Sequence, residues 1–114
     1  MTIRVVNKRT GGTGEYVGRP SPLGNPYKIG PDGDRDAVVE KYKKWLIKHL
    51  FNATEEHRAV HAEINRLHNL HAAKGDLNLV CWCAPKRCHA DMIKGVLDLM
   101  MEETLLEAQK DFRK

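Results

Sequence analysis

The sequence LNLVCWCAPKRCHADM, residues 77–92, decides the fold that we expect for this chain. Its first part, residues 77–83, contains no charged side chain, which is typical of a strand covered on both faces. Alternation along a strand places Cys81 and Cys83 on one face and Trp82 on the other. The simplest interpretation therefore makes the cysteines small buried residues beside a core tryptophan.

A helix start follows this strand. Pro85 ends the strand because it has no N–H to donate, and apolar residues recur at helical spacing from His89 onward. Asp91 lies three residues after Cys88, where an acidic side chain favours a helix N-terminus. Cys88 and His89 should then lie just past the C-terminal end of a strand, where ligands bind in open α/β sheets. Such a helix end attracts anions and lowers the pKa of a thiol.

Two functional interpretations of these side chains stay open. In the first, Cys88 and His89 contact an anion or a nucleotide as polar or reactive groups. In the second, a zinc ion is bound by Cys81, Cys83, Cys88 and His89, although these lack the paired C-x2-C spacing of common zinc modules. We favour the anion pocket, which needs no cofactor, and keep zinc as the alternative.

The N-terminal part supplies a second polar cluster. Residues 2–8 and 15–17 are predicted to be strands. The stretch GRPSPLGNPYKIG, residues 18–30, contains three prolines and three glycines, which exclude regular structure and favour one fixed loop shape. Within this loop, donors suited to phosphate, carboxylate or a base edge are Arg19, Ser21, Asn25 and Lys28.

The net charge of +4 is concentrated in the same region. Residues 1–30 carry five basic side chains and one acidic side chain, Glu15, whereas the rest of the chain carries fourteen of each. This asymmetry indicates a local anion-binding surface rather than a general nucleic-acid coat, so nucleic acid is the weaker candidate partner.

Composition and length restrict the class of protein. A chain of 114 residues with 41% hydrophobic residues is expected to form one domain with its own core. No apolar run approaches the ~20 residues of a membrane-spanning helix, and we expect no membrane partner. Three cysteines, two of them one residue apart, do not indicate a disulfide framework, so we expect a reducing cytoplasm.

Two amphipathic helices are expected before the strand of residues 77–83, at residues 36–50 and 55–74. The histidines of the second helix are interpreted as surface or boundary residues. Residues 102–114 are predicted to be a charged helical extension. Its apolar side chains would dock either on the core or on a second subunit of a homodimer, and they are Leu105, Leu106 and Phe112.

Three stretches together resemble a family of phages and bacteria known as domain of unknown function 4326: VVNKR (5–9), YVGRPSPLGNPY (16–27) and CWCAPKRCHAD (81–91). The resemblance covers residues 3–99, with Tyr27 where the family usually has phenylalanine. It implies a small α/β domain, often phage-borne. The family's motif positions that we take as candidate site residues are Arg19, Ser21, Gly24, Asn25, Cys83, Cys88, His89 and Asp91.

We therefore predict an α/β fold with a small, mainly parallel, Rossmann-like sheet flanked by helices in two or three layers. A single compact ligand-binding domain would span residues 1–101, with residues 102–114 as the extension. The strand of residues 77–83 would be central. The loop of residues 18–30 and the N-terminus of the last helix would meet at the sheet's C-terminal edge.

The leading function is binding of a small anionic, nucleotide-like ligand between that loop and the last helix, in phage nucleotide metabolism or counter-defence. The ligand-binding residues would be Arg19, Ser21, Gly24, Asn25, Lys28 and Cys83. If the protein is an enzyme, we expect a transferase or hydrolase acting on a nucleotide or nucleoside, with Cys88, His89 and Asp91 as catalytic residues. The alternatives are a zinc-binding adaptor that contacts nucleic acid or a host protein, and an interaction protein that binds a host target without a ligand.

Overall fold

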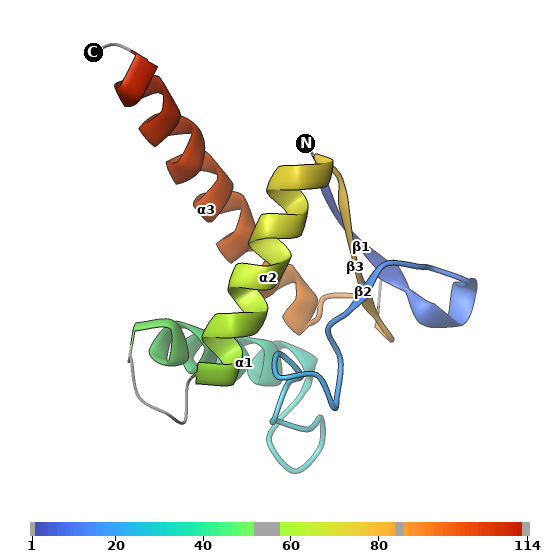
Figure 1. Ribbon diagram of the computed structural model, residues 1–114. Helices are drawn as coiled ribbons and strands as arrows, with labels where there is room; N and C mark the ends of the chain where they lie inside the picture. The colour runs from blue at the N-terminus through green and yellow to red at the C-terminus, as the bar shows by residue number, and fades with distance from the viewer. Residues whose placement is uncertain (1, 52–57, 84–85, 113–114) are drawn as a thin grey trace.

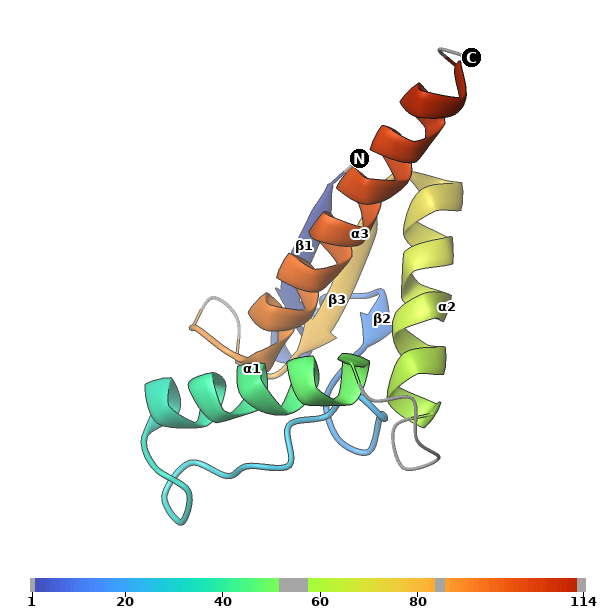
Figure 2. The same cartoon turned by 90° about the vertical axis from the view of Figure 1, so that its left-hand side faces the viewer.

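The fold is a parallel β-sheet with helices packed on one side of it (Figures 1 and 2). The computed structural model describes residues 2–51, 58–83 and 86–112. In chain order its elements are β1 (Ile3–Asn7), a 3-10 helix (Lys8–Thr10), β2 (Glu15–Tyr16), α1 (Arg35–Phe51), α2 (Arg58–Lys74), β3 (Leu77–Cys81) and α3 (His89–Phe112). The strand order is β1-β3-β2 and every pairing in it is parallel, which confirms the predicted α/β class and the central place of β3.

Strand β3 ends at Cys81, two residues earlier than the sequence predicts. The physical reason is its partner, because the ladder with β1 finishes at the pair Asn7 and Cys81. Beyond this pair the backbone bends through Trp82, whose side chain is 46% exposed. The expectation of a core tryptophan is therefore wrong. Pro85, the predicted strand stop, lies outside the described residues.

A loop rather than a helix covers the second face of the sheet. Val6 of β1 and Val80 of β3 are paired in register. Because side chains alternate between the two faces of a sheet, both valines point away from the face on which Cys81 packs in the core with the helices. A Cβ atom on Gly12 would lie 2.8 Å from the backbone oxygen of Asn7 and from Val6, so the loop packs directly on this face. The sheet therefore has one helical layer, and residues 11–14 cover its other side, the right-hand side in Figure 1.

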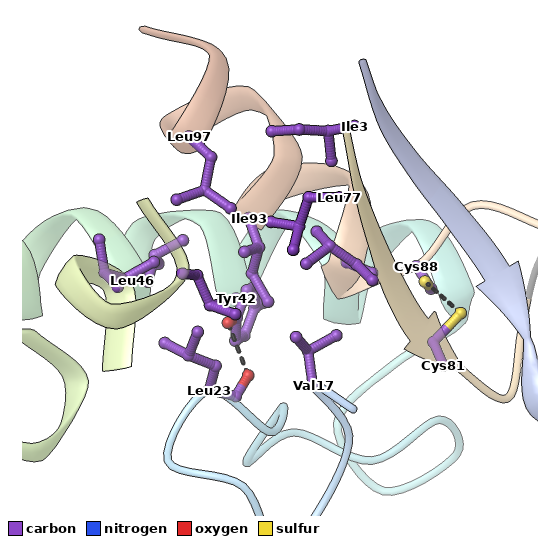
Figure 3. Packing of buried hydrophobic residues seen from close by; sticks show 14 of the residues in the cluster. Ile3, Val17, Leu23, Tyr42, Leu46, Leu77, Cys81, Cys88, Ile93 and Leu97 are labelled. Atoms are coloured by element: carbon purple, nitrogen blue, oxygen red, sulfur yellow. Dashed lines mark hydrogen bonds between the residues drawn. The ribbon is translucent and has the colours of Figure 1, made fainter. Parts of the chain in front are cut away.

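The core between sheet and helices also fixes the loop of residues 18–30 (Figure 3). Leu23 of this loop is fully buried, and its backbone oxygen accepts a hydrogen bond of 2.7 Å from the hydroxyl of Tyr42 in α1. Burial raises the pKa of Tyr42 far above its ordinary value, so the hydroxyl stays protonated and keeps donating. The proline-rich loop is thus held to α1 by one buried side chain and one buried hydrogen bond.

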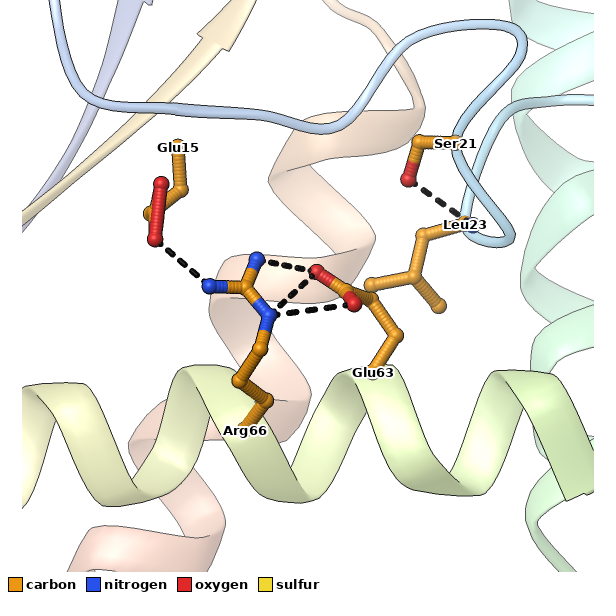
Figure 4. Close-up of polar contacts among 5 residues, drawn as sticks. All are labelled: Glu15, Ser21, Leu23, Glu63 and Arg66. Carbon is orange, nitrogen blue, oxygen red and sulfur yellow. Dashed lines mark hydrogen bonds and ion pairs between the residues drawn. The ribbon is translucent and has the colours of Figure 1, made fainter.

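Helix α2 contacts the sheet through apolar residues and through one ion-pair network (Figure 4). The guanidinium of Arg66 pairs with Glu63 of the same helix and, at 2.7 Å, with Glu15 of β2. His71 lies one turn after the buried Leu67 and is only 1% exposed, so the interpretation of these histidines as surface or boundary residues is wrong for this one.

Helix α3 is continuous from His89 to Phe112, so residues 102–112 extend the same helix beyond the sheet. Met101 is buried, whereas Leu105 is 46% exposed and does not pack on the core. Among the described residues, no helix has the length and apolar character needed to span a membrane.

Candidate functional site

A cleft of about 520 Å³ opens at the C-terminal edge of the sheet. The described residues of its walls come from the loop of residues 18–30, the first turns of α1, residues 82–83 after β3, residues 87–89 at the start of α3, and Tyr16 at the end of β2. Asn25 and Cys88 both line it, so the loop and the helix N-terminus lie together at the predicted place. Six residues proposed from the sequence line this cleft: Arg19, Asn25, Lys28, Cys83, Cys88 and His89.

His89 is the most constrained of these side chains. It is 9% exposed, and its Nε2 lies 2.8 Å from the backbone oxygen of Val17. Because a carbonyl oxygen only accepts, Nε2 must carry the proton and Nδ1 keeps a lone pair. Burial lowers the pKa of His89, the hydrogen bond to Val17 opposes this, and the nearby positive charge of Arg19 lowers it further. The imidazole is therefore neutral at pH 7 and is able to accept a proton at Nδ1.

Cys88 does not have the lowered pKa that its place at a helix N-terminus predicts. Its side chain is buried, and burial raises the pKa of the thiol to about 12, even though the backbone N–H of Ala90 favours the thiolate. The buried Cys81 adds to this shift, with its Sγ atom 3.5 Å from that of Cys88 (Figure 3). At neutral pH Cys88 is a thiol, which makes it a weak nucleophile.

Four other residues proposed from the sequence hold backbone groups in place. Ser21 accepts a hydrogen bond from the backbone N–H of Leu23 (Figure 4), and the Asp91 carboxylate accepts one from the N–H of Cys88 at 3.0 Å. The Asn25 side chain accepts from the N–H of Tyr27 and donates to the oxygen of Val38. A Cβ atom on Gly24 would lie 2.9 Å from the backbone of Arg19. Of these four, only Asn25 lines the cleft.

Positive charge surrounds the cleft. Arg19 and Lys28 are exposed, and neither forms an ion pair within the described residues. Arg87, by contrast, pairs with Asp36 and Glu40 of α1 at 3.1 and 2.6 Å. Its backbone oxygen accepts a hydrogen bond of 3.2 Å from Arg35, which ties the first turn of α1 to the segment before α3. The side chains of Arg19 and Lys28 are therefore available to an anionic ligand, although the Asp32 carboxylate accepts a hydrogen bond of 2.8 Å from the backbone N–H of Lys28.

The lining residues that sequence reasoning did not propose include two aromatic residues and two arginines: Tyr16, Trp82, Arg35 and Arg87. The two arginines carry no motif of their own, although Arg87 directly precedes Cys88 and His89. Tyr16 was assigned only to a short strand, and Trp82 to the core. The end of β3 at Cys81, which the sequence does not mark, places Trp82 at the cleft, and the pairing of Tyr16 with Val80 places Tyr16 there.

The alternative zinc set does not converge on one point. Cys81, Cys83, Cys88 and His89 are all described, yet nowhere in the described chain do three or more His, Cys, Asp or Glu side chains come together to hold a metal ion. His89 directs Nε2 to the backbone of Val17, so only Nδ1 of this ring could reach a metal ion. This geometry does not fit a zinc site.

Comparison with known proteins gives one family and one relative. A family model described as domain of unknown function (DUF4326) matches residues 4–99. A protein of Enterobacteria phage T4, named as an uncharacterized 12.4 kDa protein in the nrdA-td intergenic region, is 32% identical over 101 residues, which cover 88% of this chain and 82% of that protein. No solved structure is significantly similar to the chain.

Proposed function

This chain belongs to the DUF4326 family, and we propose that it binds a phosphorylated, nucleotide-like ligand in the cleft at the C-terminal edge of its sheet. The observation that carries the proposal is that two cationic side chains of the cleft form no ion pair within the described chain. The side chains of Arg19 and Lys28 line the cleft without an ion pair to any described residue, beside the neutral imidazole of His89. Among the described residues, no acidic side chain lines the cleft, and such a site is suited to phosphate.

The size and the walls of the cleft also favour a nucleotide. A volume of about 520 Å³ lies within the range of small-molecule sites, which is about 300–1,000 Å³. Tyr16, Tyr27 and Trp82 supply aromatic surface in the same walls. Aromatic rings stack on nucleobases, whereas an inorganic anion alone would gain nothing from them.

If the protein catalyses a reaction, His89 is the residue suited to proton transfer. Its free Nδ1 would accept a proton from an attacking hydroxyl or water, in a transfer or hydrolysis reaction on a nucleotide or nucleoside. Cys88 would instead shape the wall, because its thiol retains its proton. In a phage protein such binding would serve nucleotide metabolism or counter-defence in the host cytoplasm.

Isothermal titration with a panel of nucleoside mono-, di- and triphosphates tests this proposal. At least one should bind, and Arg19→Ala with Lys28→Ala should weaken it by about 10- to 100-fold, the usual loss of a charge-assisted hydrogen bond. The matched control is Lys43→Ala with Lys74→Ala, which removes the same charge from exposed positions outside the cleft. Equal losses in the two double variants, or no binding by any nucleotide, would contradict the proposal and favour an interaction protein without a ligand.

A further inference from the structure

We propose that the nucleotide in the cleft is part of a single-stranded nucleic acid, and that Trp82 is the platform on which one of its bases stacks. This inference rests on the proposed function, because it names the class of ligand for the same cleft. It reverses the lower rank that the sequence gave to nucleic acid from its local charge, because the structure adds an exposed aromatic ring beside that charge. The structure leaves the Trp82 side chain 46% exposed at the cleft wall.

Hydrogen bonds hold the Trp82 ring in one orientation. Its Nε1 donates to the hydroxyl of Tyr16 at 3.0 Å, and this hydroxyl in turn donates to the backbone oxygen of Arg19 at 2.7 Å. The side-chain amide of Asn7 donates to the backbone oxygen of Trp82 at 3.3 Å. A large exposed apolar ring with its polar atom already bonded is a preorganised stacking surface.

A second pair of cations lies on this platform and outside the cleft. The Nζ atom of Lys8 lies 5.0 Å from the ring centroid of Tyr16 and 5.4 Å from that of Trp82, and the guanidinium carbon of Arg9 lies 6.0 Å from the Trp82 centroid. Neither cation has an ion-pair partner in the part of the chain that the structure describes. Glu15, the one acidic residue among residues 1–30, is directed to Arg66 instead.

The order of these groups matches a strand better than a single nucleotide. Arg19 and Lys28 in the cleft suffice for one phosphate group, and Lys8 and Arg9 would be unused. With a base on Trp82, the next phosphodiester of a strand would lie on the side of Lys8 and Arg9. Aromatic platforms that alternate with cations are typical of single-strand binding, because the bases of a duplex are already stacked on one another.

Fluorescence anisotropy with a labelled, 5′-phosphorylated ten-nucleotide oligo-dT strand tests this inference. Trp82→Ala should weaken binding by about 5- to 150-fold, the usual loss of one stacked base, whereas Trp82→Phe should retain most of the affinity. Lys8→Ala with Arg9→Ala should lower the slope of log affinity against log salt by about 1.4, because each phosphate contact of a single strand contributes about 0.7. Lys43→Ala with Lys74→Ala is again the charge-matched control, and thermal unfolding verifies that each variant is folded.

Parallel titration with mononucleotides separates the two proposals. If mononucleotides bind and the strand binds no tighter, or if Trp82→Ala and Lys8→Ala with Arg9→Ala leave strand binding unchanged, only the single-strand inference is overturned. Equal binding of the complementary duplex would also overturn it. If neither mononucleotides nor the strand bind, both proposals fail. Tight binding of the single-stranded oligonucleotide that depends on Trp82, and on Lys8 with Arg9, supports the single-strand inference.

Discussion

Replacing Tyr42 by phenylalanine removes one atom at the point where the proline-rich loop is fixed to the core. The hydroxyl donates a 2.7 Å hydrogen bond to the backbone oxygen of Leu23, and both residues are fully buried. Without the donor, this carbonyl stays buried and unsatisfied, which costs about 1–3 kcal/mol. Since small domains are stable by only about 5–15 kcal/mol, we expect the Tyr42→Phe variant to lose a measurable share of its free energy of unfolding.

Urea denaturation followed by circular dichroism measures this loss. The midpoint should fall while the dependence on urea stays the same, because the surface exposed on unfolding does not change. Thermal unfolding should move down by about 3–6 °C for each kcal/mol lost in a chain of this size.

The matched control is Tyr27→Phe, which makes the same chemical change in a half-buried side chain. Its hydroxyl has no hydrogen bond to any described residue, and only the ring lies near Lys41. This variant should stay within about 0.5 kcal/mol of the parent. Coincident urea midpoints for the Tyr42 and Tyr27 variants would refute the claim that Tyr42 anchors the loop.

Three further predictions follow from burial and pairing. Iodoacetamide at neutral pH should label the half-buried Cys83 well before the buried Cys81 and Cys88. The intact mass of the protein before and after denaturation would show this difference in labelling. Rapid labelling of Cys88 would contradict its raised pKa. Because burial lowers the pKa of His89 in the fold, the unfolded chain binds a proton at this residue more readily, so the stability present above pH ~6.5 is lost as the pH falls. Between pH 7 and 5 the urea midpoint should therefore drop less in a His89→Gln variant than in the parent protein. Equal drops in the two proteins would show that His89 does not cause the loss of stability. Arg66→Met should cost less than about 1 kcal/mol in urea denaturation, because the Arg66 side chain is 47% exposed and water screens its ion pairs. A greater loss would make this network a main support of the fold.

The sequence predicts the elements and the place of the cleft because local patterns encode both. An uncharged run that includes Leu77, Leu79 and Cys81 marks the central strand. Apolar residues at helical spacing, with Asp91 three residues after Cys88, mark the start of α3. Parallel strands all end at one edge of the sheet, so the loop after β2 and the helix after β3 must meet there. The roles given to the cations and to His89 at this edge stay predictions.

The state of the individual side chains depends on long-range packing, which one sequence does not show. Asn25 and Ser21 look like ligand donors in a list of residues, but their partners are backbone groups of the loop and of α1. The pKa of Cys88 follows from how deeply the thiol is buried rather than from its place at a helix end. Trp82 was misplaced for a similar reason, because the end of β3 is set by the length of β1.

The strand order β1-β3-β2 has a consequence for how the chain folds as it is synthesised. Strands β1 and β2 pair with β3 and not with each other, and β3 is formed by residues 77–81. Until the ribosome has made that segment, the first two strands have no sheet to join. The same delay applies to His89 and Trp82, which follow β3. Folding of this domain therefore waits for contacts between distant parts of the chain, and a nascent chain that stops before residue 77 lacks both the sheet and the cleft.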